Sequence, residues 1–193
     1  MKITRTNIKN GAKIIVKFKD LPELRKIYKN KRIVFCSGSF DLTHAGHVLF
    51  LEDCKKFGEI LVVAVAPDET MKIYKEGRPI LNEHIRLKMI SALKPVDHCF
   101  MQPHIPFTTI DGLNDVLHIL FEQLKPDVYV INSDAAGISH RREILKRYPH
   151  IKFCILKRTA PKSFGAISTT GIIEKIRGAV LKKPMPMHKF RNI

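Results

Sequence analysis

Tryptophan is absent from this 193-residue chain, and cysteine is scarce and scattered. The four cysteines, Cys36, Cys54, Cys99 and Cys154, form no C-x-x-C pair and have mostly apolar neighbours. The nine histidines do not combine with them in the spacing of a zinc site. The cysteine pattern therefore predicts buried, reduced thiols in an intracellular protein.

Long hydrophobic runs are also missing. The longest strongly apolar run, Ile60–Ala66, is far too short to span a bilayer. The first ten residues are polar and basic and lack the apolar core of a secretory signal. No Gly-x4-Gly-Lys-Ser/Thr loop occurs, which excludes a P-loop NTPase. We therefore expect a cytoplasmic protein with no membrane partner.

Acidic residues are few. The 34 Lys and Arg outnumber the 18 Asp and Glu, which gives a net charge of +16. An excess of this size favours anionic partners, and nucleic acid, phosphorylated metabolites and acidic membranes all qualify. Aromatic residues make up only 8% of the chain, and no RNA-binding signature is present. Nucleic acid therefore stays open as a partner but is not favoured.

Apolar segments and helical segments alternate along the chain. Strands separated by helices of about ten residues indicate βαβ units and a parallel sheet. Asn82 and Asp111 are expected to cap two of the helices. The sequence thus predicts an α/β, Rossmann-like, five-stranded parallel sheet with helices on both faces, with strands at 33–36, 60–66, 96–101, 127–131 and 151–156 and helices at 47–57, 82–93, 112–124, 139–148 and 168–176.

Three regions follow from this pattern. Residues 31–181 are expected to form the domain, and residues 1–30 an N-terminal extension of a strand and a helix, with the helix beginning near Pro22. Residues 182–193 form a basic tail with two prolines. Because ligands of an open parallel sheet bind beyond the carboxyl ends of its strands, we expect the site in the loops that follow the five strands.

The loop after the first of these strands carries the strongest chemical signal. It contains His44-Ala45-Gly46-His47 at the start of a helix. A helix N-terminus offers free N–H donors to an anion, Gly46 permits close approach, and two imidazoles add donors to a phosphoryl group. His-x-Gly-His alone is a weak motif, but its position between a buried strand and a helix makes it far stronger.

Several ordered motifs together resemble the cytidylyltransferase-like nucleotidyltransferases. Gly38-Ser39-Phe40-Asp41 and the His-x-Gly-His motif match the family signature, and Leu124-Lys125-Pro126-Asp127 leads the fourth strand as in that family. The resemblance covers residues 13 to 178 and is nearest to the adenylyltransferase half of ADP-heptose synthases and to glycerol-3-phosphate cytidylyltransferases. The remaining matches are Ala66-Pro67-Asp68-Glu69, Lys72, Lys75, Arg78-Pro79-Ile80, Glu83, Arg86, Val96-Asp97 and Ile167-Ser168-Thr169-Thr170.

The resemblance implies nucleotidyl transfer with Mg²⁺ and release of pyrophosphate, in a homo-oligomer. The partners it implies are ATP or CTP and a phosphorylated small-molecule acceptor. Such a transfer needs positioning and charge neutralisation rather than a protein nucleophile. No protein side chain is assigned to the metal. The resemblance assigns catalysis to His44, His47, Lys72 and Arg86, nucleotide binding to Ser39, Phe40, Asp41, Gly46, Asp134, Ser168, Thr169 and Thr170, and acceptor binding to Asp68, Lys75, Arg78 and Arg158.

Each assignment has a plainer alternative. Ser168-Thr169-Thr170 could be a simple helix cap, and Lys72 and Lys75 could be surface lysines in a loop. Arg86 could pair with Glu83 one turn away, and Asp41 could orient its loop instead of reaching Mg²⁺ through water. Arg141-Arg142 is either a solvated helix face or a binding site for the phosphate of the acceptor.

The chain also departs from its relatives. Asn132-Ser133-Asp134 replaces a Gly-Gly-Asp, and Arg158 lies further from Ser168 than the corresponding arginine of the cytidylyltransferases. Ala45 and Arg78-Pro79-Ile80 favour ATP over CTP. Sugar phosphates lead as acceptors, followed by polyol or alcohol phosphates and then a flavin phosphate. A nucleic-acid-binding protein and a regulatory nucleotide-binding module are the other classes that the sequence leaves open.

Overall fold

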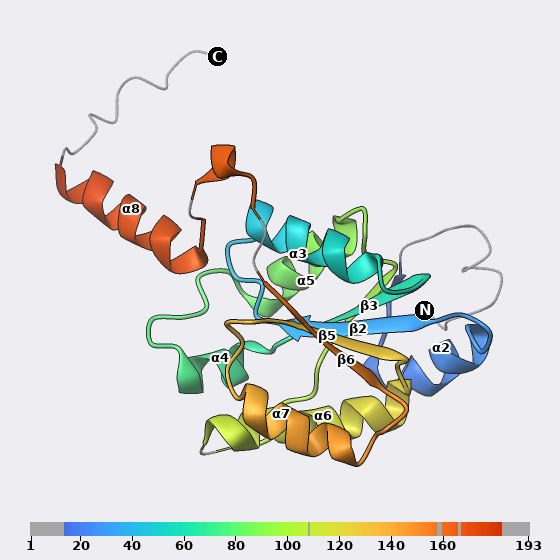
Figure 1. Cartoon of the computed structure of the whole chain (residues 1–193). Coiled ribbons are helices and arrows are strands. Elements are labelled where there is room, and N and C mark those ends of the chain that lie inside the picture. The colour runs from blue at the N-terminus through green and yellow to red at the C-terminus, as the bar shows by residue number, and fades with distance from the viewer. Residues whose placement is uncertain (1–13, 108, 158–159, 166, 183–193) are drawn as a thin grey trace.

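The computed structural model describes residues 14–107, 109–157, 160–165 and 167–182. Six strands form one sheet in the order β1-β4-β3-β2-β5-β6, and every neighbouring pair is parallel (Figure 1). The strands are β1 (Ile14–Ile15), β2 (Ile33–Gly38), β3 (Ile60–Val65), β4 (His98–Met101), β5 (Val128–Asn132) and β6 (Lys152–Leu156). The five predicted strands and the Rossmann-like fold are thereby confirmed, and the two-residue β1 joins the sheet as a sixth strand from the predicted N-terminal strand and helix extension.

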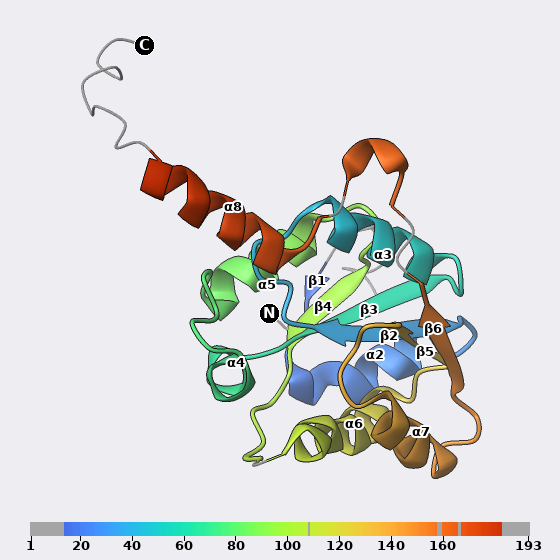
Figure 2. The ribbon, with the colours of Figure 1, turned by 60° about the vertical axis from the view of Figure 1, so that its left-hand side comes forward.

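Helices cover both faces of the sheet, as Figure 2 shows. One face carries α2 (Leu21–Ile27), α6 (Ile110–Leu124) and α7 (Ile138–Lys146), and the other carries α3 (Ala45–Lys55) and α5 (Glu83–Ala92). Because neighbouring residues of a strand point to opposite faces, Phe35 joins the first core while Val34 and Cys36 join the second.

The remaining elements lie near the carboxyl ends of the strands. They are α4 (Asp68–Tyr74) and α8 (Thr169–Lys182), with two short 3-10 helices at Phe18–Asp20 and Lys162–Phe164. Figures 1 and 2 both show α8 extending away from the sheet. Among the described residues, no helix is both long enough and apolar enough to cross a bilayer.

The helix limits agree closely with expectation, with two corrections. Asn82 accepts a hydrogen bond from the Ile85 N–H and caps α5, as predicted. Helix α6 is capped by the Thr109 side chain, not by Asp111, because the helix begins earlier than predicted. The segment with Lys72 was expected to be a loop, but it forms α4.

The expected N-terminal extension is in part built into the domain. Leu21 and Leu24 of α2 have no exposed surface, so each contributes about 1.5–3 kcal/mol of hydrophobic stabilisation to the same core. Arg25 forms an ion pair with Asp127, 2.8 Å between Nη1 and Oδ2, and this ties α2 to the start of β5. Residues 183–193 of the predicted basic tail lie outside the described residues.

Candidate active site

A cavity of about 780 Å³ opens at the carboxyl ends of the strands. The chain runs outward from β2 to β3 and β4, and then returns to place β5 and β6 on the other side of β2. This reversal between β2 and β5 is the position at which open parallel sheets bind ligands. The cavity is lined by the loop after β2, the segment after α4, the ends of β4 and β5, and parts of α3, α6, α7 and α8.

The two motif histidines line this cavity at the N-terminus of α3. His44 is the N-cap residue, and its Nδ1 accepts a hydrogen bond of 3.1 Å from the Gly46 N–H. The His47 Nδ1 in turn accepts from the His44 N–H at 3.4 Å, and the two rings stack with centroids 4.0 Å apart. Because each Nδ1 accepts a hydrogen bond from a backbone N–H, the neutral imidazoles carry their own hydrogen on Nε2. Both histidines can therefore donate an N–H to a ligand in the cavity.

Gly46 is required by the position of the His44 ring. A Cβ atom at residue 46 would lie 3.0 Å from Cε1 and 3.1 Å from Nδ1 of His44. The preceding loop is also unusual, because Phe40 and Leu42 have φ angles of +50° and +45°. Non-glycine residues adopt this left-handed region only when the surroundings hold them there.

Asp41 holds that loop in place. Its carboxylate is buried and accepts hydrogen bonds of 3.0 Å from the backbone N–H groups of Ile80 and Leu81. Arg78 donates to the same carboxylate at 3.3 Å. With both oxygens bound to protein groups, Asp41 orients the loop, in agreement with the plainer of its two predicted roles.

Arg86 was expected to be catalytic, and that role stays a prediction. Its guanidinium is fully buried and is not among the residues that line the cavity. It donates to the backbone carbonyls of Leu81 at 2.9 Å, of Ser39 at 2.5 Å and of Ala66 at 2.7 Å. Arg86 thus joins three loops at the carboxyl edge of the sheet and holds them in position.

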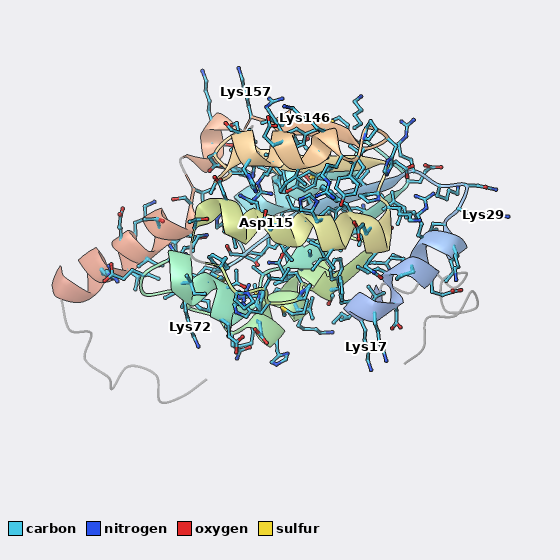
Figure 3. All side chains as sticks on the ribbon, turned by 90° about the horizontal axis from the view of Figure 1, so that it is seen from below. Lys17, Lys29, Lys72, Asp115, Lys146 and Lys157 are labelled. Carbon is cyan, nitrogen blue, oxygen red and sulfur yellow. The ribbon has the colours of Figure 1, made fainter. Side chains whose placement is uncertain are left out.

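Asp68 and Lys72, which were assigned to acceptor binding and catalysis, also lie outside the lining of the larger cavity. The Asp68 carboxylate pairs with Arg86 at 2.7 Å, outside the cavity lining. The Glu83 carboxylate accepts from the Asp68 N–H, so the ion pair of Arg86 is with Asp68 and not with Glu83. Lys72 is exposed on α4 and absent from the cavity lining, and Figure 3 shows its side chain at the outside of the molecule.

Lys75 and Arg78 are the predicted cations that do line the cavity. The Lys75 Nζ donates to the Ser39 hydroxyl at 2.9 Å, and Arg78 donates to the Thr170 hydroxyl at 3.2 Å. Burial lowers the pKa of Lys75 below its ordinary value, and the nearby charge of Arg78 lowers that pKa further, while the carboxylates of Asp41 and Asp134 oppose the shift. Because burial disfavours the charged form of Lys75, a phosphate that binds beside it would stabilise that charge.

The start of α8 closes another side of the cavity. The Ser168 hydroxyl accepts from the Gly171 N–H at 3.0 Å, which is the helix cap that the sequence left open as an alternative. The Thr169 hydroxyl donates to the backbone carbonyl of Asp41 at 2.9 Å. Ser168, Thr169 and Thr170 all line the cavity, so the capping role and a place beside a ligand coexist.

Sequence reasoning missed several lining residues or gave them little weight. Asp134 lines the cavity as predicted, and Arg158 lies outside the described residues. Gln102 and Asn114 were not predicted, although Gln102 directly follows a predicted strand and could have been found from that position. The sequence left Arg141 either on a solvated helix face or in a binding site for the acceptor phosphate. In the structure Arg141 lines the cavity and donates to the Tyr129 hydroxyl.

A second cavity, of about 470 Å³, lies on the other side of the histidine pair. Both His44 and His47 line it, as they line the larger cavity. Its other walls come from α3, from the end of β6 and from the segment before α8, and include Leu49, Phe50, Leu156 and Ile167. The two cavities share the imidazoles together with Phe50, Asn132 and Ser168, and their remaining walls differ.

Residues 35–175 match the family model described as cytidylyltransferase-like. The chain belongs to the cytidylyltransferase-like family. This confirms the resemblance on the signature motifs and makes the protein a nucleotidyltransferase, a class whose reactions suit a site built from phosphate-binding groups without a protein nucleophile.

Known members of the cytidylyltransferase-like family include close relatives of this chain. It is 40% identical over 118 residues to the bifunctional protein HldE of Desulfatibacillum aliphaticivorans, a match that covers 58% of this chain and 22% of the relative. It is 40% identical over 101 residues to the FAD synthase of Aciduliprofundum boonei, covering 52% of this chain and 60% of the relative. The FAD synthase of Ferroglobus placidus is 34% identical over 145 residues, which cover 74% of this chain and 86% of that enzyme. The chain thus matches under two thirds of the first two relatives and most of the third.

Solved structures support the same family fold. A lipopolysaccharide core biosynthesis protein from Thermoplasma volcanium is 30% identical with a TM-score of 0.52, and the match covers 68% of this chain and 98% of that one. A pantoate-beta-alanine ligase from Francisella tularensis has a TM-score of 0.57 at 15% identity, covering 93% of this chain and 82% of that one, and shows the shared fold alone.

Proposed function

We propose that this protein transfers a nucleoside monophosphate, from ATP in preference to CTP, to a phosphorylated small molecule and releases pyrophosphate. The observation that carries the proposal is that two separate cavities meet at His44 and His47. A transfer between two substrates needs one compartment for each, with the reacting phosphorus at their junction.

The smaller cavity suits the base and ribose of the nucleotide. Its lining is in part apolar, through Leu49, Phe50 and Leu156, and it continues toward Ser168 at the start of α8. The triphosphate then extends along the helix N-termini of α3 and α8, where backbone N–H groups and the helix dipole favour anions. Mg²⁺ would enter with the triphosphate, whose oxygens supply most of the ligands that this ion prefers.

The larger cavity suits the acceptor. Lys75 and Arg78 provide positive charge for its phosphate close to the loop that carries the histidines. In the reaction a phosphate oxygen of the acceptor attacks the α-phosphorus in line, the bond to the β-phosphate bridging oxygen breaks, and pyrophosphate leaves. The Nε2–H groups of His44 and His47 would donate to the oxygens of the α-phosphate as charge builds on them.

The preference for ATP rests on the motif and on the relatives. Ala45 stands at the variable position of the His-x-Gly-His motif, as in the adenylyltransferase half of the ADP-heptose synthases. FAD, the product named for two of the relatives, contains an adenylate joined to a flavin phosphate. A cytidylyltransferase that acts on glycerol 3-phosphate or another alcohol phosphate is the alternative.

The test is release of pyrophosphate from ATP or CTP with Mg²⁺ and a panel of phosphorylated acceptors. We expect His47→Ala to lower kcat by about 10²–10³-fold, since it removes one donor to the transition state. The matched control is His84→Ala, because His84 is exposed on α5 and does not line either cavity. Equal turnover by H47A and H84A, with both variants folded by circular dichroism, would refute the assignment.

A further inference from the structure

Arg141 is a cation of the larger cavity to which the proposed function gives no task. It lies in α7, which packs on the face of the sheet opposite to the histidine helix α3. Lys75 and Arg78 approach the cavity from another side, because they contact the loop after β2 and the start of α8. The charged groups that shift the pKa of Lys75 include Arg78 and Asp134 but not Arg141. Arg141 is therefore a separate centre of positive charge in the cavity.

Protein groups fix the guanidinium of Arg141 without using all of its donors. Its Nε donates to the Ala136 carbonyl at 3.1 Å, and its Nη1 donates to the Tyr129 hydroxyl. The guanidinium carbon also lies 5.9 Å from the centre of the Tyr129 ring, which has no exposed surface and so forms a rigid support. A guanidinium carries five N–H groups, and among the described residues none accepts from Nη2. Donors of Arg141 therefore remain for a ligand in the cavity.

The charge of Arg141 also differs from that of other shielded arginines in how it is balanced. Arg25, Arg78 and Arg86 each form an ion pair with an aspartate. Arg141 is half-buried, yet it forms no ion pair within the part of the chain that the structure describes. Partial removal of a cation from water costs free energy when no anion balances it. A bound anion would offset this cost.

The carboxylates that line the larger cavity leave this end of it open to an anion. Asp134 lies between β5 and α7, but it forms no ion pair with Arg141 and its charge acts on Lys75. Helix α6, which packs against α7, contributes the neutral amide of Asn114, and the end of β5 contributes that of Asn132. The other lining carboxylates are Asp41, which Arg78 holds, Glu76 in the segment after α4, and Glu174 on α8.

We propose that Arg141 forms an oxyanion subsite for the acceptor, and that the acceptor carries a carboxylate or a second phosphate besides the phosphate that attacks the nucleotide. The inference rests on the proposed function, which places the attacking phosphate near Lys75 and Arg78. Carboxylate and phosphate both present two oxygens to the parallel N–H donors of a guanidinium. The amides of Asn114 and Asn132 suit hydroxyl groups on the carbon chain between the two anions.

Pairs of sugar phosphates that differ by one anionic group test the subsite. Glucose 6-phosphate is compared with 6-phosphogluconate, which adds a carboxylate, and fructose 6-phosphate with fructose 1,6-bisphosphate, which adds a phosphate. Each is titrated calorimetrically into the full chain, with and without α,β-methylene ATP and Mg²⁺. We expect the second anion to tighten binding about tenfold in at least one pair, the effect of one hydrogen-bonded charge contact. The nucleotide analogue should not displace these ligands, because the two substrates occupy different cavities.

Variants at two neighbouring positions assign the effect to Arg141. Arg141→Gln should abolish the preference for the second anion, and Arg141→Lys should restore part of it. Arg142→Gln is the matched control, because it removes the same charge from an exposed side chain that does not line the cavity and lies 5.6 Å from the centre of the Phe153 ring. It should keep the preference. Urea denaturation checks that each variant folds, and if R141Q does not fold, the wild-type pairs and R141K decide.

The outcomes separate this inference from the proposed transfer. Equal binding within both pairs by the wild type overturns the inference, as does an equal loss of preference in R141Q and R142Q. Displacement by α,β-methylene ATP would assign Arg141 to the triphosphate and would overturn it too. Tight binding that depends on Arg141, without release of pyrophosphate from ATP or CTP, would count against the transfer and leave the subsite standing. Release with the one-anion acceptors alone would support the transfer and overturn the inference.

Discussion

Single side chains at the carboxyl edge of the sheet divide into groups that face the cavity and groups that hold the loops around it. Arg86 belongs to the second kind, because it is buried and bonded to backbone carbonyls of other loops. Asp41 belongs to both, because it binds the backbone of another loop and also lines the cavity. His44, His47 and Lys75 belong to the first kind. The two kinds respond differently to substitution, which makes their roles separable by experiment.

Removal of the Arg86 guanidinium should affect folding before it affects catalysis. Arg86→Met leaves the Asp68 carboxylate without its ion pair and three backbone carbonyls without their donors. We expect the free energy of unfolding to fall by about 3–5 kcal/mol. Urea denaturation measures the free energy of unfolding. The control is Lys88→Met at an exposed position of the same helix, for which we expect a change in this free energy of less than about 0.5 kcal/mol. A stable R86M with lost turnover would instead make Arg86 a catalytic residue.

Lys75 should set the alkaline limb of the activity profile. Burial lowers the pKa of Lys75, so its side chain loses the positive charge at a lower pH than the side chain of an ordinary lysine. The pKa of an ordinary lysine is near 10.4. Because a phosphate binds the cation, kcat/KM should fall as the pH rises through this lowered pKa. The same shift makes the free energy of unfolding rise with pH over the interval between the lowered and the ordinary pKa, because the unfolded chain there binds the extra proton.

Substitution by arginine gives the measurement. Lys75→Arg keeps its charge to higher pH, so the alkaline limb of kcat/KM should move upward. The control is Lys72→Arg on the exposed side of α4, which should leave the limb where it is. If kcat/KM falls at the same alkaline pH in K75R and in the wild type, a group other than Lys75 causes the fall.

At the scale of an element, the N-terminus of α3 is a preformed anion site whose geometry depends on a glycine. Gly46→Ala places a Cβ 3.0 Å from the His44 ring and must displace it. We expect kcat to fall several-fold, because the His44 ring has to move by a few tenths of an ångström, and losses of about 10²-fold belong to misplacements of about 1 Å. Stability should be unchanged or higher, since alanine favours a helix more than glycine does.

A glycine elsewhere in the structure provides the comparison. Gly178 lies in α8 with no atom within 4 Å of an added Cβ, so Gly178→Ala should leave kcat unchanged. Thermal unfolding and turnover of both variants, measured side by side, separate the helix effect from the effect on His44. Full activity in G46A would show that the His44 ring position is not critical.

At the scale of the whole molecule, the charge of +16 favours anionic substrates. Figure 3 shows the labelled lysines on several sides of the molecule and not along a single stripe. Positive charge on several sides of the molecule acts as a general positive field. Such a field raises the encounter rate with anions and is screened by salt.

The expected consequence is a salt-dependent kcat/KM. Raising NaCl from about 0.05 M to about 0.3 M should lower kcat/KM for ATP several-fold while kcat changes little, because screening acts on encounter. Sucrose at equal osmolality is the control and should have no such effect. A kcat/KM that stays flat across this range would show that the net charge does not assist substrate capture.

The sequence by itself determined the parallel α/β fold, because short apolar runs alternate with helices in a pattern that local interactions and burial both favour. It also determined the histidine site, since all its parts lie within eleven consecutive residues at one strand-to-helix turn. The pairing of β1 with β4 could not be predicted, because a strand of two residues carries no periodicity, and α4 forms in a segment that was expected to be a loop.

Only the tertiary structure decided which charged groups line the cavity. Arg86 and Lys72 match the family motifs as Lys75 and Arg78 do, yet Arg86 is buried among carbonyls and Lys72 lies outside the cavity. The lining of the larger cavity likewise combines residues from α3, α6, α7 and α8 that no local pattern links. The physical reason is that burial and hydrogen-bond partners depend on contacts between distant segments, whereas a motif records only neighbours along the chain.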